Sequence, residues 1–245
     1  MVSILKLAIN DFKNIIRDKF LIYAAIIMPV MLIVLSRIVI HVIAPSLEDT
    51  PISVVTSKYD MIFMLFTTMI PLVYGFIAAF MILDERDEHL LTVLRVMPIS
   101  RNSYLIYRMF FLSIFSFIVL LVFPPLSGLL ADFPEFSYIS YIPVAVLFSL
   151  LTPFSALLVS SFATNKVQAF AIFKISGTVY IIPLFMFLIQ GNLRYIFSLV
   201  PNFWAFFTLK EVINTGINDY LHLGIGFVYV MSLIGLLFYL FNKKY

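Results

Sequence analysis

The chain has 245 residues, of which 62% are hydrophobic, 17% aromatic and only 12% charged, against about 25% charged residues in an average soluble domain. A soluble fold cannot bury this much apolar surface, so the composition excludes a soluble globular protein and predicts that lipid surrounds most side chains. The absence of cysteine excludes disulfides, thiolate metal sites and a cysteine nucleophile. The formal net charge of +3 is interpreted as a marker of membrane orientation rather than of nucleic-acid binding.

Residues 3–19 are predicted to form an amphipathic helix at the membrane surface. Phe12 and Ile16 fall on its apolar side, and Lys13 and Arg17 fall on its polar side, which is typical of a helix that lies in the interface. Two roles stay open for it: simple anchoring, or anchoring combined with contact to a cytoplasmic partner. Because charged residues precede the first apolar run, we expect no cleaved signal peptide.

Six apolar stretches are long enough to cross the hydrocarbon core, which requires about 20 helical residues. They are residues 20–44, 61–83, 104–131, 140–162, 169–190 and 221–241. Backbone groups in lipid must be satisfied within the segment, so each stretch is predicted to be a helix. Several contain proline, and we expect neighbouring helices or hydroxyl side chains to replace the hydrogen bonds that proline removes. The sequence thus predicts an all-α polytopic membrane protein with a single transmembrane domain over residues 1–245.

Two small-xxx-small pairs lie within these stretches, Gly75 with Ala79 and Ala156 with Ser160. Small residues at this spacing let two helix backbones approach closely. The pairs therefore favour close helix contact at these positions.

Lysine and arginine are distributed unequally between the two sides of the predicted bundle. Twelve lie on the side of both termini, and four, Arg37, Lys58, Arg194 and Lys210, lie on the other. The positive-inside rule then predicts that both termini are cytoplasmic. We therefore expect a multi-pass protein of the cell (plasma) membrane.

The loop between the second and third spans carries an acidic run followed by an apolar stripe, and a proline ends the predicted helix. Its candidate functional residues are Glu85, Arg86, Asp87, Glu88, Leu91, Leu94 and Pro98. Two interpretations stay open for this short helix: it rests on the lipid headgroups, or a soluble protein binds it. Clustered carboxylates are repelled by an anionic leaflet, which favours the second interpretation.

The connection over residues 191–220 is the longest on the outer side, and it is unusually apolar. Pro201, Phe203 and Trp204 lie within it. This content predicts short helices that pack over the mouth of the bundle or dip into the interface. We interpret the segment as a lid or an exit gate, with an ordinary aromatic belt as the alternative.

The predicted spans contain no aspartate or glutamate, whereas ion-coupled transporters usually keep a carboxylate at membrane depth. Arg37 and His41 lie one turn apart in the first span. They either extend to the interface or meet an anionic ligand on a substrate path. The chain also lacks metalloprotease, serine-hydrolase and phosphate-loop motifs, so active transport would require a partner that hydrolyses nucleotide.

The loop after the second span resembles the coupling helix of the ABC-2 family of exporter membrane subunits. The family pattern E-R-[ED]-E-G-T-L-x-x-L-x-V-x-P is similar to residues 85–98, with His89 and Leu90 in place of the usual glycine and threonine. Residues 200–204 resemble the family's proline-aromatic motif before the last span, and the six-span plan matches over the whole chain. Within the family, the acidic run is closest to permeases named for drug or fluoroquinolone export.

The resemblance implies a half-size permease that forms a homodimer or pairs with a paralogous permease. It implies export of a hydrophobic or amphipathic substrate (drug, lipid or peptide), driven by a separate cytoplasmic ABC ATPase that binds ATP and Mg²⁺. This chain itself would then be no enzyme and would bind no cofactor, no metal and no nucleic acid. Residues 85–88 would make polar contacts with the ATPase, while Leu91 and Leu94 hold the helix to its own domain. The alternative is a non-transport membrane scaffold or a sensor accessory protein that binds another soluble partner through residues 84–101.

Overall fold

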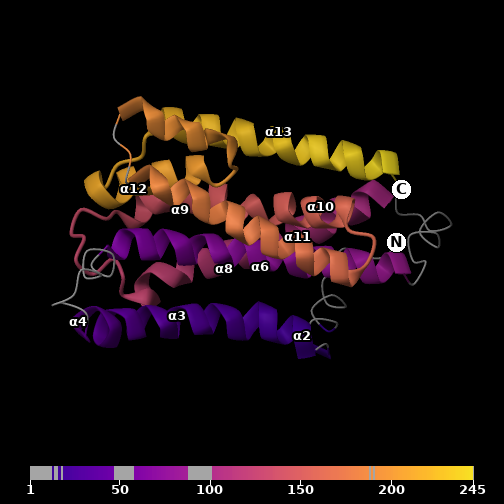
Figure 1. The fold of residues 1–245 in the computed structure, drawn as a ribbon, viewed down its shortest axis with the longest axis horizontal. Coiled ribbons are helices and arrows are strands. Elements are labelled where there is room, and N and C mark those ends of the chain that lie inside the picture. Colours follow the sequence, from indigo (N-terminus) through magenta and orange to yellow (C-terminus); the bar gives the residue numbers. More distant parts are fainter. Residues whose placement is uncertain are drawn as a thin grey trace.

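The computed structural model describes residues 13, 16, 17, 19–46, 58–87, 101–187, 189 and 191–244. These ranges are helical apart from short connections and contain no strand. Six of the helices are long and apolar enough to cross a membrane, which confirms the predicted all-α fold with six spans. Figure 1 shows the long helices side by side in one elongated bundle.

The helices follow one another along the chain with few connections. The first span comprises α2 (Lys19–Ile22), η1 (Tyr23–Ile27), α3 (Met28–Ile38), η2 (Val39–Ile43) and α4 (Ala44–Ser46). The second and third are α6 (Tyr59–Asp87) and α8 (Arg101–Ser127), and the fourth is α9 (Tyr138–Ser149) with α10 (Leu151–Phe162). The fifth is α11 (Lys166–Ile181) with η4 (Ile182–Phe187), followed by η5 (Gly191–Leu199), α12 (Phe203–Thr215) and the sixth span, α13 (Tyr220–Lys244).

Helix α6 forms the centre of the bundle. In its most apolar stretch 72% of the residues are buried, against 17% in the first span. It packs chiefly on α10 and α8, while α3 lies against α8 and α13 lies against α10 and α12. In Figure 1, α3 and α13 accordingly run along opposite sides of the bundle.

The closest approach between α6 and α10 occurs at Gly75. A Cβ atom at this position would lie 2.6 Å from the Ser155 Cβ and 2.6 Å from the Thr152 carbonyl oxygen. No side chain fits there, so only glycine lets the two backbones meet. Close helix contact at the small-residue pair that begins at Gly75 is thus confirmed.

The first span keeps its helical path past Pro29 because another helix replaces the missing hydrogen bond. Proline has no N–H, so it cannot donate to the carbonyl four residues earlier, which is that of Ala25. The Tyr74 hydroxyl of α6 donates to this carbonyl at 2.7 Å. The helix also widens into the π-type turn η1 just before the proline, which is a common adjustment around such a defect.

The end of α8 repeats this arrangement. Pro124 and Pro125 leave the carbonyls of Leu120 and Leu121 without helical donors. The hydroxyls of two tyrosines at the start of α9 donate to them: Tyr141 to Leu120 at 3.1 Å, and Tyr138 to Leu121. Replacement of proline's missing bonds by a neighbouring helix is therefore confirmed at three prolines, with tyrosine as the donor.

The two ends of the bundle differ in charge. The end that holds Lys19, Arg86, Lys166 and Lys244, called here the basic end, is also the end where the C-terminus lies in Figure 1. At the opposite end, α12 turns into α13 at Gly216, whose φ of 70° is accessible mainly to glycine. A Cβ atom there would lie 2.4 Å from the Glu135 carbonyl oxygen, so this turn seats directly on the segment before α9.

Candidate functional site

Helix α6 continues beyond its predicted end at Leu83, and its last turn binds its neighbours through alternating charges. Asp84 forms an ion pair with Lys166 at 2.6 Å. Glu85 pairs with Arg108 and accepts a hydrogen bond from Tyr104, both on α8. The acidic run that the sequence singled out is therefore rooted in the bundle at its first residues.

Arg108 is the most unusual side chain of this region because it is buried, with 1% of its surface exposed. Besides Glu85, its guanidinium contacts the Met81 sulfur at 3.3 Å and lies 5.3 Å from the centre of the Tyr104 ring. Removing one partner of a buried ion pair typically costs about 3–5 kcal/mol, since the other charge is left without compensation. The pair thus ties α6 to α8 where the predicted coupling segment begins.

Arg86 and Lys244 bind the end of α10. Arg86 donates to the carbonyls of Ala163 at 3.1 Å and Thr164 at 2.6 Å, and Lys244 donates to that of Ser161 at 2.8 Å. The last carbonyls of a helix lack intrahelical donors and carry partial negative charge, so cations are favourable there. The basic end consequently joins α6, α10 and α13 through one set of carbonyls.

The predicted coupling residues divide into two groups. Glu85 and Arg86 point into the bundle as described, and Asp87 is exposed at the end of α6. The remaining positions lie outside the described residues; they are Glu88, Leu91, Leu94 and Pro98. Contact of this segment with an ATPase stays a prediction, and Glu85 and Arg86 also act within the chain.

Sequence reasoning missed Arg108 as a site residue because it was counted only among the basic residues on one side of the membrane. A signal was present in the sequence. Tyr104 and Arg108 are four residues apart and share a helix face, and the 84–101 loop returns this face to the level of Glu85.

The predicted outer gate folds around His222 at the start of α13. The ring of His222 lies 4.5 Å from that of Phe207, 6.0 Å from that of Trp204 and 6.2 Å from that of Tyr195. Phe203 is fully buried beside Tyr195, at 6.1 Å between ring centres. These five residues are called the His222 cluster, and they join η5, α12 and α13.

Polar contacts fix the orientation of the His222 ring. Its Nε2 lies 3.2 Å from the Tyr195 hydroxyl, and its Nδ1 contacts the Asp219 carboxylate. Partial burial acts to raise the pKa of Asp219, but the hydrogen bonds from His222 outweigh it and leave that pKa below its ordinary value. Arg194 lies 4.7 Å from the centre of the Phe207 ring, a cation–π contact that adds to the cluster.

The predicted gate residues therefore have different roles in the structure. Phe203 and Trp204 belong to the His222 cluster, whereas Pro201 is buried next to α11 and does not reach it. Asn202, between them, is fully buried and donates to the Tyr180 carbonyl at 2.8 Å, near the end of α11. A gating function for this segment stays a prediction.

Arg37 and His41 lie on the first span toward the end opposite the basic end. The Arg37 Nε donates to the Leu126 carbonyl at 3.0 Å, so this arginine binds the end of α8. A Cβ atom at Gly128 would lie 2.7 Å from its guanidinium, which shows how closely the loop after α8 covers it. His41 is exposed in η2. A role of either residue on a substrate path stays a prediction.

Within the described ranges, no group of three or more histidine, cysteine, aspartate or glutamate side chains is placed to hold a metal ion.

Comparison with known proteins gives a consistent result. The family model described as "Fluoroquinolones export permease protein Rv2686c-like" matches residues 11–238. The chain is similar to the fluoroquinolones export permease proteins Rv2686c and MT2760 of two Mycobacterium tuberculosis strains, H37Rv and CDC 1551 / Oshkosh. Each is 28% identical over 185 residues, which cover 75% of this chain and 71% of the relative. No solved structure matches it significantly.

The family match spans all six helices that can cross a membrane. It agrees with the resemblance to ABC-2 permeases and, within them, to fluoroquinolone export permeases. The chain is a multi-pass membrane protein, and it belongs to the Rv2686c-like family of fluoroquinolone export permeases.

Proposed function

We propose that this chain is the membrane subunit of an ATP-driven exporter whose ATPase is a separate cytoplasmic protein. Its substrate would be a hydrophobic or amphipathic compound of the fluoroquinolone type, by analogy with the relatives named for that export. The basic end faces the cytoplasm under the positive-inside rule. The membrane-spanning unit is a dimer, formed either by two copies or with a paralogous permease.

The observation that carries the proposal is the junction of Glu85 with Arg108. It lies directly before the segment that resembles a coupling helix, and it links that segment to α8. Arg86 links the same turn to the end of α10. A partner that pushed on residues 85–98 would therefore move α6, α8 and α10 together rather than bend one flexible loop.

The absence of a phosphate-loop motif in the sequence supports the separation of transport and hydrolysis. In this scheme ATP and Mg²⁺ bind to the partner, and Asp87 with Glu88 offers it an acidic surface. The energy for transport reaches the spans as movement of charged contacts, not as an ion passing through the bundle.

Charge removal at Asp87 and Glu88 tests the partner contact. The double variant Asp87→Asn/Glu88→Gln should lower recovery of a phosphate-loop ATPase with the solubilised chain and lower drug export by cells that express both proteins. The control Asp132→Asn/Glu135→Gln removes the same charge from exposed residues in the loop between α8 and α9, and it should change neither result.

The two competing functions give different outcomes. If no ATPase is recovered with the wild-type chain and a kinase or another soluble protein is recovered instead, the scaffold or sensor function replaces the proposal. The junction itself is tested by Arg108→Met, which should leave ATPase binding intact while export is lost. Export that survived Arg108→Met in a folded protein would exclude this junction as the path of coupling.

A further inference from the structure

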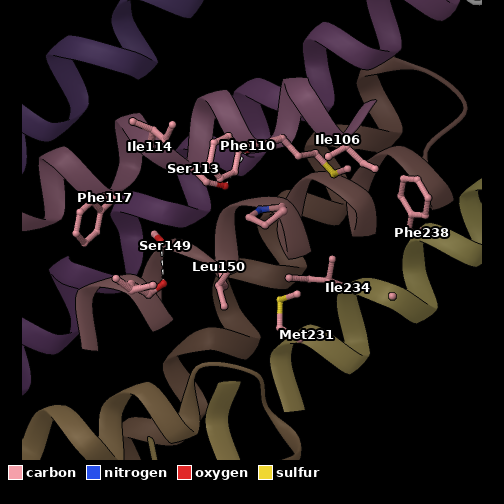
Figure 2. Close-up of a pocket in the computed structure, with 14 residues that line it drawn as sticks. Ile106, Phe110, Ser113, Ile114, Phe117, Ser149, Leu150, Met231, Ile234 and Phe238 are labelled. Carbon is pink, nitrogen blue, oxygen red and sulfur yellow. Dashed lines mark hydrogen bonds between the residues drawn. The ribbon is translucent and has the colours of Figure 1, made fainter. Parts of the chain in front are cut away.

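An apolar groove runs along the bundle between α8 and α13. Its floor is the bend between α9 and α10, and its volume is about 510 Å³. Figure 2 shows Ile106 and Phe110 of α8 on one wall and Ile234 and Phe238 of α13 on the other, with Leu150 between them. Phe110 is 66% exposed, so the groove opens sideways toward the surroundings of the bundle.

The lining chemistry selects hydrocarbon. Of the lining side chains, only Ser113 and Ser149 have polar groups, and each hydroxyl already donates to its own helix, Ser113 to the Met109 carbonyl at 2.8 Å and Ser149 to that of Val146 at 2.7 Å. A carboxylate or amide placed here would lose water without gaining a donor. The groove is therefore unsuited to a zwitterionic drug and suited to an alkyl chain.

The length and position of the groove match one leaflet. Ile106 and Phe117 mark its extent along α8, and a helix rises about 16 Å between them at ~1.5 Å per residue. This is close to half of a hydrocarbon core of about 30 Å. The groove begins near the basic end, since Ile106 lies five residues after Arg101, the first residue of α8 (106 minus 101).

A helix from a second copy is too large to occupy the groove. A helical stretch of about 16 Å with a diameter of about 10 Å would fill roughly 1,200 Å³, more than twice the groove volume of about 510 Å³. A partner helix could cover the rim but could not enter it. A single flexible chain is the occupant that fits both the volume and the chemistry.

The basic end of the groove favours a negative headgroup. On α13 the helix continues from Phe238 to Asn242, Lys243 and Lys244. Lys243 is exposed, so its ammonium group is available to a phosphate at the membrane surface. Each such lysine favours anionic lipids, by a factor of about five.

We propose that the groove between α8 and α13 binds one acyl chain of an anionic phospholipid from the leaflet at the basic end, with its headgroup at Lys243. This site is independent of ATP-driven export.

Two glycines of α13 allow a matched test. A side chain added at Gly235, which lines the groove, or at Gly224, which lies outside it, meets no other atom within 4 Å. Gly235→Leu should therefore fill the groove without disturbing the fold, and Gly224→Leu makes the same change elsewhere on the helix. Phe110→Trp fills the groove from the opposite wall.

The probe is a phosphatidylglycerol with a photoactivatable diazirine in one acyl chain, mixed into phosphatidylcholine vesicles that contain the full chain. We expect labelling of the groove, mapped by mass spectrometry, to exceed labelling of the exposed face of α3 at least fivefold. Gly235→Leu and Phe110→Trp should remove this excess, and Gly224→Leu should preserve it. A phosphatidylcholine probe should label about fivefold less, a difference that Lys243→Gln should abolish.

Three results would overturn the site. Equal labelling of the groove and of α3 would mean ordinary annular lipid only. Undiminished labelling in both filling variants of a folded protein would place the lipid elsewhere. Cross-links between copies from a photoreactive residue at position 110 would identify a second chain as the occupant.

Discussion

The contact between Tyr74 and the carbonyl freed by Pro29 makes a quantitative prediction. Tyr74 is 2% exposed, and its hydroxyl donates to Ala25 at 2.7 Å. Tyr74→Phe removes this donor and leaves a carbonyl that Pro29 cannot satisfy. A buried polar group left without its partner costs about 1–3 kcal/mol, and in a chain of this size about 1 kcal/mol shifts the melting temperature by roughly 2–4 °C.

A double-mutant cycle separates this effect from simple loss of packing. Pro29→Ala restores an N–H that can donate to Ala25 within the helix, so Tyr74→Phe should cost much less in that background. We expect the single change to lower the midpoint of thermal unfolding by roughly 2–12 °C in detergent, and at least half of this loss to disappear when Pro29 is replaced as well.

The control is Tyr229→Phe, because the Tyr229 hydroxyl donates to the Leu199 carbonyl at 2.6 Å at an exposed position. Water can replace that bond, so its midpoint should stay within about 2 °C of wild type. The reasoning is refuted if Tyr74→Phe costs the same with and without Pro29, since the hydroxyl would then not serve the carbonyl that proline leaves free.

Three further changes test other contacts. Gly216→Ala should destabilise the protein by more than about 2 kcal/mol in chemical unfolding, because it adds a clash to the strain of a positive φ, whereas Gly191→Ala, with φ 73° and open space around it, should cost only about 1 kcal/mol. Gly75→Leu should abolish the folded, monodisperse protein seen on gel filtration, because the backbones of α6 and α10 must separate; a normal elution profile would contradict the close contact. Asp219 has a lowered pKa, so its contact should persist above about pH 4 and be lost as pH falls through that lowered value. The fluorescence of Trp204, the single tryptophan, should report this acid transition and should not show it in Asp219→Asn.

The span architecture could be predicted because it depends on local properties. Length and apolarity of each segment decide whether it can cross lipid, and six such helices are present. The end of the second span was less predictable. Hydropathy ends it at Leu83, but the helix continues to Asp87, because ion pairs with Lys166 and Arg108 compensate Asp84 and Glu85.

Pairings between distant residues could not be read from the sequence. Proline identifies the carbonyl that loses its donor, but the donor depends on which helix packs alongside. Tyr74, Tyr138 and Tyr141 could be recognised in this role only once α6 and α9 were placed. The same holds for the His222 cluster, since Phe203 and Trp204 were predicted as an aromatic segment but His222 lies in the next helix.

The central claim is that transport is driven from the basic end by a partner, and transport by purified protein in vesicles tests it most directly. Fluoroquinolone uptake into inverted vesicles should require the co-purified ATPase together with ATP and Mg²⁺, and it should be absent when the chain is present alone. Uphill movement by the chain alone on a proton or sodium gradient would contradict the account.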